Sequence, residues 1–510
     1  MTNFSRRQFL AAMAVIGTGT FLTACTSRES TAGDGAASGD EVENVNVLRV
    51  GALGKAARAQ RDPYQLLPND SDMLISSLIW EALTVPGEKE TVVPRLMQEW
   101  KQNNPTEWEF MIADGATFHD GSSVTSEDVV WSLKKMLSDE ENSFRLPVMP
   151  DSIRAAGANV VVMETAEPNS QLPMLARLMT FVMKKGSSAE KPIGSGPFQL
   201  VSWENGSAKL KRFDNYHGTV AGVAEVHVIP FEDSTAMTNA LLSGQIDLAQ
   251  AAGPIAARSV EGNEDIKIVR RMNDSVIPLI MRTSDGPFSD VKVRQALRLA
   301  VDREQIIQRA LSGYGTPAND ILGTADSNLD SSLVRKRDVV KAKNLLQEAD
   351  FDLEKTYDLY VTPEAPGQVE AMKVIADQVK EIGMTLNVVE QDSGTFYDET
   401  WTKADLYCGY WGTNDSVLFF AGKVLDGDAA SNETAFDDAE FNEIYDQVLE
   451  STDTERINQL SRQLQKIEFE RSGYLVWGAS DGVDIARANL SGLPKAPGYG
   501  RVLLETVQKA

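Results

Sequence analysis

Residues 94–137 read PRLMQEWKQNNPTEWEFMIADGATFHDGSSVTSEDVVWSLKKML. Trp108, Phe110 and Ile112 alternate along the chain, which predicts a strand with one buried face. The sequence His-Asp-Gly follows a few residues later. Gly121 ends it and can take a positive φ at little cost, so a tight turn is expected there.

A helix is expected to begin directly after Thr125. A threonine at the N-cap and an acidic residue three positions later form a capping-box pair, and Asp128 supplies that acid next to the positive end of the helix dipole. The apolar residues that follow recur at helical spacing and should form one buried face. They are Val129, Val130, Leu133, Met136 and Leu137.

The same stretch resembles the solute-binding proteins of peptide- and nickel-type ABC importers, the extracytoplasmic family 5 group. The resemblance rests on Pro94-Arg95-Leu96 with Trp100, on the strand at 108–112, and on the turn at 118–121 with its capped helix. Further similar motifs occur at 192–198, 287–297 and 300–304, so the resemblance extends over about residues 48–504. In the motif at 192–198, Gly194 and Gly196 are expected to mark special backbone angles.

The resemblance implies an α/β class, specifically a two-lobed periplasmic-binding-protein-like fold with an extra third domain (cluster C type). In the family the first lobe is interrupted in sequence. By analogy, domain I comprises residues 46–70, 192–288 and 478–510, the extra domain II comprises 71–191, and domain III, the second lobe, comprises 289–477. Within domain III, residues 357–361, 368–382 and 384–390 should form a parallel strand–helix–strand unit.

The amino terminus has the pattern of an export signal. Arg6 and Arg7 form a twin-arginine (Tat) motif, and the apolar run after them is too short to span a membrane comfortably. The run ends in Leu-Thr-Ala-Cys, a lipobox, so cleavage of residues 1–24 and lipidation of Cys25 are expected. Residues 26–45 are small and polar and are expected to form a flexible tether.

Composition excludes several functions for this chain of 510 residues. Its net charge of −25 opposes binding to nucleic acid. Only two cysteines are present. If Cys25 is lipidated, Cys408 has no disulfide partner, and zinc clusters are ruled out. Three histidines leave little room for histidine-rich catalysis, and we expect no metal and no cofactor.

One pattern of a hydrolase does occur. Gly478, Ser480 and Gly482 satisfy G-x-S-x-G, the nucleophile elbow. In that fold a histidine must follow the serine, whereas all three histidines of this chain precede Ser480. We interpret the match as chance and predict that the protein is not an enzyme, with a secreted lipoprotein hydrolase as the weaker alternative.

Candidate ligand-binding residues lie where aromatic side chains crowd the sequence between 397 and 420. Half of these are expected to be core residues. By resemblance, the loop 411–416 falls where peptide-binding relatives carry an aspartate that pairs with the peptide's ammonium group. Here Asn414 occupies that place and Asp415 follows it, so Asp415 takes the role or the ligand lacks an ammonium there; an ordinary turn aspartate is an equal alternative. The predicted site is Tyr397, Trp401, Tyr410, Trp411, Asn414 and Asp415.

The resemblance therefore implies an extracytoplasmic, lipid-anchored and monomeric solute-binding protein. Its partners would be the permease and ATPase subunits of an ABC importer. Its ligand would be an oligopeptide or dipeptide, with a nickel chelate, a sugar or an opine as the alternative. A sensor or adhesion protein on the same fold is a further alternative. Capture would occur between the two lobes by hinge closure.

Overall fold

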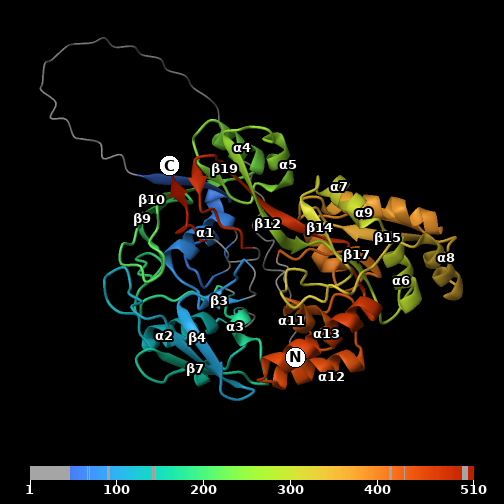
Figure 1. The fold of residues 1–510 in the computed structure, drawn as a ribbon, viewed down its shortest axis with the longest axis horizontal. Coiled ribbons are helices and arrows are strands. Elements are labelled where there is room, and N and C mark those ends of the chain that lie inside the picture. Colours follow the sequence, from blue (N-terminus) through green and yellow to red (C-terminus); the bar gives the residue numbers. More distant parts are fainter. Residues whose placement is uncertain are drawn as a thin grey trace, which may run out of the picture. The chain divides into compact units, whose positions relative to one another are not determined.

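The structure, a computed structural model, describes residues 46–510 except for 66, 68, 89–91, 140–141, 143–144, 178, 413–415, 430 and 497–502. The expected export signal, lipidated Cys25 and tether all lie outside the described residues. Three sheets organise the described part of the chain, and helices α1 to α13 pack around them (Figure 1).

The largest sheet contains strands from both ends of the described chain. Its order is β12-β19-β11-β1-β10-β9-β8, with β14 pairing to β19. β1 runs parallel to β10 and β11, whereas β19 runs antiparallel to β11, β12 and β14. The strands are β1 (Val47–Leu53), β8 (Phe198–Glu204), β9 (Ser207–Arg212), β10 (Glu225–Phe231), β11 (Leu248–Ala249), β12 (Ile266–Val276), β14 (Gly315–Pro317) and β19 (Gly478–Arg487). The helices α1 (Asp70–Ile79), α4 (Ser234–Leu242) and α5 (Gly253–Ser259) contact strands of this sheet.

A four-stranded antiparallel sheet is inserted in sequence between β1 and β8. It has the order β4-β5-β7-β6, and its core is continuous with that of the largest sheet, because Leu48 and Val226 belong to the same buried cluster as Phe110 and Leu133. Its strands are β4 (Met97–Gln102), β5 (Glu107–Ile112), β6 (Arg154–Ala155) and β7 (Val160–Glu164), accompanied by the pair β2 (Thr84–Val85) and β3 (Val93–Pro94) and by α2 (Ser126–Leu137) and α3 (Leu172–Leu175).

The third sheet has the order β16-β15-β17-β13-β18. Successive residues of one of its strands, 279–281, face opposite sides of the sheet. Leu279 and Met281 belong to one buried cluster, whereas Ile280 belongs to another. Its strands are β13 (Leu279–Met281), β15 (Thr356–Val361), β16 (Thr385–Glu390), β17 (Leu406–Cys408) and β18 (Tyr474–Leu475). Its helices are α6 (Val291–Ala300), α7 (Arg303–Ala310), α8 (Val339–Glu348), α9 (Gln368–Gln378), α10 (Ser393–Thr395), α11 (Val417–Phe420), α12 (Ala439–Glu450) and α13 (Thr454–Arg471), and the short pair β20 (Leu490–Ser491) and β21 (Gln508–Lys509) lies near the carboxyl end of the chain.

The stretch that opened the sequence analysis folds as predicted. β5 buries Trp108, Phe110 and Ile112, and Gly121 has a φ of 83°. The capping box of α2 is formed: the backbone N–H of Thr125 donates to Oδ2 of Asp128 at 3.0 Å. β15 and β16 are parallel, as expected for the strand–helix–strand unit. The domain boundaries proposed from the resemblance remain a prediction.

The expectation for the glycines of the 192–198 motif was wrong in its physical reason. Neither Gly194 nor Gly196 has a positive φ. Instead, the backbone of this segment passes directly over the end of α1, and a Cβ on either glycine would overlap the carbonyl group of Ile79. The glycines are needed because two backbones approach closely, and this contact joins α1 to the start of β8.

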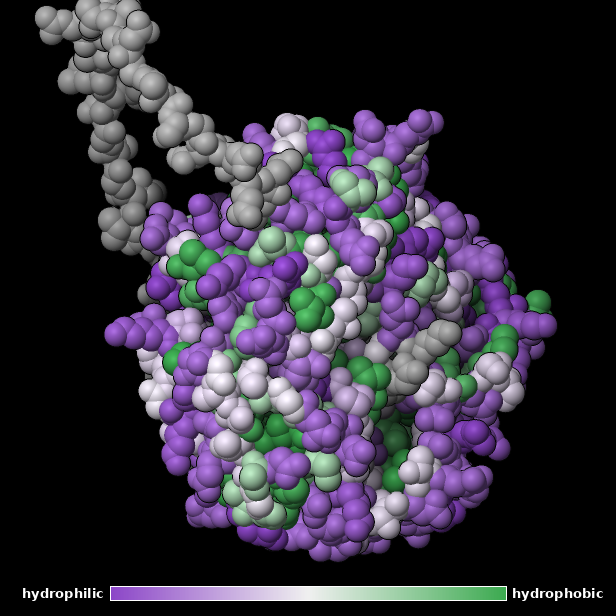
Figure 2. Space-filling model, turned by 60° about the vertical axis from the view of Figure 1, so that its left-hand side comes forward, coloured by the Kyte–Doolittle hydropathy of each residue, from purple (hydrophilic) through white to green (hydrophobic). Residues whose placement is uncertain are grey.

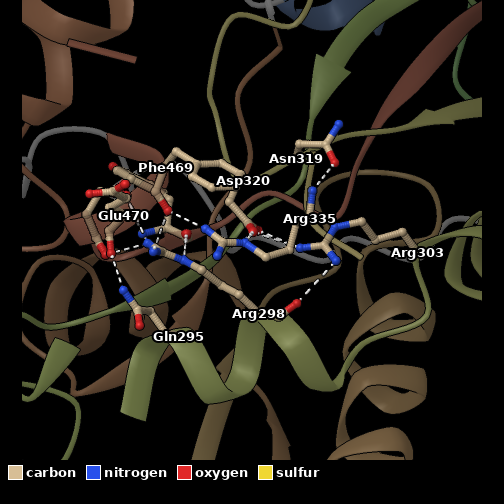
Figure 3. A network of polar contacts seen from close by, with 10 residues as sticks. Gln295, Arg298, Arg303, Asn319, Asp320, Arg335, Phe469 and Glu470 are labelled. Atoms are coloured by element: carbon tan, nitrogen blue, oxygen red, sulfur yellow. Dashed lines mark hydrogen bonds and ion pairs between the residues drawn. The ribbon is translucent and has the colours of Figure 1, made fainter. Parts of the chain in front are cut away.

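In the second lobe, two buried arginines and a half-buried one lie close to one buried aspartate (Figure 3). Asp320 is fully buried, and both of its carboxylate oxygens accept from Nη2 of Arg303 at 2.8 Å. Arg335 donates from Nε to Asp320 at 2.9 Å, and Arg298 donates to carbonyl oxygens of Phe469 and Tyr474 at the end of α13 and the start of β18. These contacts fasten α6 and α7 to α13.

The face of the molecule shown in Figure 2 is mostly hydrophilic, and its hydrophobic residues form small separate patches. This agrees with the net charge of −25, which favours a hydrated surface.

Replacement of Asp128 by Ala should lower the free energy of unfolding by about 1–2 kcal/mol, because it removes the capping box and the acceptor for the Lys185 backbone N–H at 2.9 Å. Urea unfolding followed by circular dichroism measures the loss. Glu127→Ala is the matched control, since the Glu127 side chain is 65% exposed, and it should change stability by less than about 0.5 kcal/mol. Equal losses in the two variants would contradict the role of the cap.

Glu468 on α13 should give the fold a pH dependence. Its side chain is 1% exposed, and burial raises its pKa to about 8. Because the folded pKa lies above the unfolded one, the folded chain keeps a proton that the unfolded chain releases between about pH 4.5 and pH 8. The free energy of unfolding should fall as pH rises through this window, by at most about 1.4 kcal/mol per pH unit from this group.

Urea titrations between pH 5 and pH 8.5 on the wild type and Glu468→Gln test this expectation. Glutamine cannot ionise, so the stability of the wild type relative to the variant should fall with rising pH. A difference that stays constant across the window would show that Glu468 keeps one protonation state.

Candidate functional site

Two short connections join the largest sheet to the sheet of the second lobe. Ile277 and Pro278 separate β12 from β13, and Val476 and Trp477 separate β18 from β19. The connections lie side by side, because β12 pairs with β19 on one side of them and β13 pairs with β18 on the other. In Figure 1, β12 (green) and β19 (red) run together from the neighbourhood of α4 and α5 toward β14 and β17. This paired ribbon joins the two lobes.

Buried ion pairs reinforce the ribbon on the side of the largest sheet. Arg271 is 2% exposed, and its guanidinium contacts the carboxylate of Asp484 on the opposite strand, with Asp274 3.6 Å away. Arg270 donates from Nε to Asp481 at 2.8 Å. The pairing of β12 with β19 is irregular between Arg271 and Ser275, which is a bulge that bends the ribbon.

Trp411 is attached to this ribbon by its backbone. Its N–H donates to the carbonyl of Val276 at 3.0 Å, and the N–H of Val276 donates back to the carbonyl of Trp411 at 3.1 Å. Val276 is the last residue of β12, so the loop that begins at Trp411 lies at the boundary between the lobes. The indole is half-buried against the aromatic cluster of the second lobe and meets Phe420 edge-on at 5.7 Å.

A buried carboxylate fixes two of the predicted tryptophans. Glu433 is 4% exposed, and its two oxygens accept the indole N–H of Trp401 at 2.9 Å and that of Trp411 at 3.1 Å. The hydroxyl of Tyr474 donates to the same carboxylate at 2.8 Å. Burial raises the pKa of Glu433 above its ordinary value, although these three donors oppose the rise. The sequence analysis predicted Trp401 and Trp411 but missed Glu433.

Of the other four predicted residues, the structure describes Tyr397 and Tyr410. Tyr397 is half-buried, meets Trp401 edge-on at 6.0 Å, and donates its hydroxyl hydrogen to Glu364 at 2.6 Å. Tyr410 is 38% exposed. Asn414 and Asp415 lie outside the described residues, so their part in the site stays a prediction.

A second buried acid stands beside the loop. Asp326 is 9% exposed and accepts the backbone N–H of Val417 at 3.0 Å and that of Asn328 at 2.8 Å. Burial raises its pKa, and the hydrogen bonds from the backbone N–H groups of Asn328 and Val417 oppose the rise. The inserted four-stranded region and the second lobe meet where the hydroxyl of Ser170 donates to the carbonyl of Val448 at 2.8 Å.

The G-x-S-x-G pattern has no catalytic geometry. Residues 478–482 lie inside β19, where the chain is extended, and not at a sharp turn from a strand into a helix. Over the part of the chain that the structure describes, no group of three or more His, Cys, Asp or Glu side chains is arranged to hold a metal ion.

The geometry thus consists of two lobes joined by paired strands, with Trp411 bonded to the end of β12 at their boundary. Residues 91–426 match the family model described as bacterial extracellular solute-binding proteins, family 5 Middle. The chain belongs to this family. Members are binding proteins and not enzymes, in agreement with the prediction from the sequence.

Individual relatives are distant. The oligopeptide-binding protein AppA of Bacillus subtilis (strain 168) is 26% identical over 354 residues, which is 64% of this chain and 64% of AppA. The glutathione-binding protein GsiB of Pectobacterium atrosepticum is 26% identical over 303 residues, which is 55% of this chain and 57% of GsiB. The chain therefore spans less than two thirds of the length of these relatives.

The fold is shared over a longer range. The crystal structure of the ABC transporter substrate-binding protein CtaP from Listeria monocytogenes matches with a TM-score of 0.77 and 19% identity, over 92% of this chain and 100% of CtaP. The predicted two-lobed periplasmic-binding-protein-like fold is thus confirmed, as is the extracellular character of the family. None of the helices in the described ranges combines the length and the apolar composition needed to cross a membrane.

Sequence reasoning missed Glu433 and Asp326 for a simple reason. The chain has 74 acidic residues, and neither of these two belongs to a motif. Their roles depend on burial and on partners far away in sequence, such as Trp401 for Glu433 and Val417 for Asp326. The crowding of aromatic residues was the signal that led to the tryptophans.

Replacement of Asp484 by Asn should lower the free energy of unfolding by about 3–5 kcal/mol, because it leaves the buried Arg271 with only the more distant Asp274. Urea unfolding monitored by tryptophan fluorescence gives the value. The control is Asp214→Asn, which removes the ion pair between Arg212 and an aspartate whose side chain is 74% exposed. This change should lower the free energy of unfolding by less than about 1 kcal/mol. If Asp484→Asn were as mild as the control, the ion pair would not reinforce the ribbon.

Proposed function

We propose that this protein is the substrate-binding lipoprotein of an ABC importer and that it captures an oligopeptide or dipeptide. Its mature chain begins at Cys25, whose lipid holds the folded part at the outer face of the cell membrane. A permease and an ATPase are its partners, and it acts as a monomer. Family membership and the oligopeptide- and glutathione-binding relatives support this proposal.

The observation that carries the proposal is the attachment of Trp411 to the inter-lobe ribbon. The N–H and the carbonyl of Trp411 both bond to Val276, so a solute touching this loop touches the hinge. Tyr397, Trp401, Tyr410, Trp411, Asn414 and Asp415 form the ligand-binding set in this proposal. A solute that contacts both lobes binds the closed form better than the open form and so shifts the equilibrium toward closure.

The proposed domains are those expected from the sequence. Domain I comprises 46–70, 192–288 and 478–510, domain II comprises 71–191, and domain III comprises 289–477. The sheets support this division, since β1, β8, β9, β10, β11, β12 and β19 share one sheet. A second candidate ligand, a non-peptide solute such as a nickel chelate, sugar or opine, is favoured by Asn414, which stands where peptide-binding relatives carry an aspartate.

Native mass spectrometry of the mature chain, purified without refolding, should show an added mass that resolves into short peptides. Trp411→Ala should lose the bound mass or weaken binding at least about 10-fold, because the indole at the hinge is gone. Trp131→Ala, another half-buried tryptophan but on α2, is the control and should keep the bound mass. A single non-peptide mass would favour the second candidate. A bound mass that Trp411→Ala leaves intact would place the site elsewhere.

A further inference from the structure

The buried carboxylate of Glu433 is hydrogen-bonded by three side chains. It is 4% exposed and accepts three hydrogen bonds, two from the indoles of Trp401 and Trp411 and one from the phenol of Tyr474. Within the described part of the chain, no arginine, lysine or histidine forms an ion pair with it. Some buried acids are in ion pairs, Asp320 with arginines and Asp484 with Arg271, whereas Asp326 and Glu468, like Glu433, accept hydrogen bonds from neutral donors.

The hydrogen-bond partners are arranged for the ionised form of Glu433. An indole N–H can donate but cannot accept, and each carboxylate oxygen receives one. A proton on either oxygen would compete with one of these donors, and only Tyr474 could accept it. The three donors therefore favour the carboxylate form against the burial that raises the pKa of Glu433, and no cation of the described residues forms an ion pair with it.

This charge acts on the faces of the two indoles. A ring that donates its N–H to a carboxylate gains electron density, and the face of an indole already attracts cations. Trp401 and Trp411 are both half-buried and pack against the aromatic cluster of the second lobe. Their neighbours Tyr397 and Phe419 meet them edge-on at 6.0 and 6.5 Å, which supports the rings from the side.

We propose that Glu433 makes the solute site selective for a ligand with an ammonium group, which lies against Trp401 and Trp411. Glu433 is a positioning residue: it orients the indoles and supplies negative potential behind them without touching the ligand. This inference rests on the proposed capture of a solute at the lobe boundary. It adds the chemical group by which the solute is recognised. A peptide amino terminus and a quaternary ammonium compound both carry this chemistry.

The first experiment tests the contact and needs no solute. The indole N–H proton resonances of ¹⁵N-tryptophan-labelled mature protein are assigned with Trp401→Phe and Trp411→Phe. Glu433→Gln should shift both resonances upfield, because a carboxylate acceptor is lost. Glu468→Gln is the matched control, another buried glutamate of the second lobe, and should leave them in place. Unmoved resonances in Glu433→Gln would overturn the proposal.

The second experiment tests selectivity with three probes: trialanine, N-acetyl-trialanine and tetramethylammonium, each followed by tryptophan fluorescence. Tighter binding of trialanine than of its acetylated form identifies the amino terminus as the cation, and binding of tetramethylammonium identifies a quaternary ammonium. Either preference should fall about 10-fold in Glu433→Gln and stay unchanged in Glu468→Gln. If Glu433→Gln does not fold, Trp401→Phe, which removes one indole face, should weaken the cationic probe by several-fold.

Equal binding of acetylated and free peptide, or no binding of either cationic probe, would overturn the inference. That result would not contradict the proposed function, because the solute that co-purifies with the mature chain tests the proposed function separately. Conversely, a chain that carries no solute and binds no peptide would contradict the proposed function. The indole resonances would still report whether Glu433 is hydrogen-bonded to the two rings.

Discussion

The antiparallel pairing of β12 with β19 is the constraint on which the rest of the structure depends. Both strands pass from the largest sheet into the second lobe, and each is followed or preceded by a two-residue connection to the next sheet. Ion pairs, one of them buried, hold the strands on one side, and β14 adds a third strand at the crossing. Because the pairing is continuous across the boundary, the ribbon ties the two lobes together.

The candidate site inherits its position from this ribbon. Trp411 bonds to the last residue of β12, and Trp401 is brought beside it through the shared carboxylate of Glu433. Asp320 and Arg303, buried elsewhere in the second lobe, form an ion pair that fastens helices. Glu433 forms no ion pair with the described residues and instead accepts hydrogen bonds from three side chains.

Local patterns in the sequence predicted much of the fold. Alternation in β5, the capping box of α2 and the parallel pair β15 and β16 all appear as expected, because each depends on residues close together in the chain. The predicted reason for Gly194 and Gly196 failed, since the constraint is the backbone of Ile79 more than a hundred positions away in sequence. The G-x-S-x-G pattern likewise lost its meaning once residues 478–482 proved to lie within a strand.

The sequence by itself determined the family and the fold, because the turn, the cap and the strand alternation of residues 94–137 are local and specific. It also singled out the aromatic residues between 397 and 411, since their density is visible along the chain. Only the tertiary structure decided which of them meet, and it alone revealed Glu433 between Trp401 and Trp411. A buried carboxylate has no local signature: its burial and its three donors come from segments that only folding brings together.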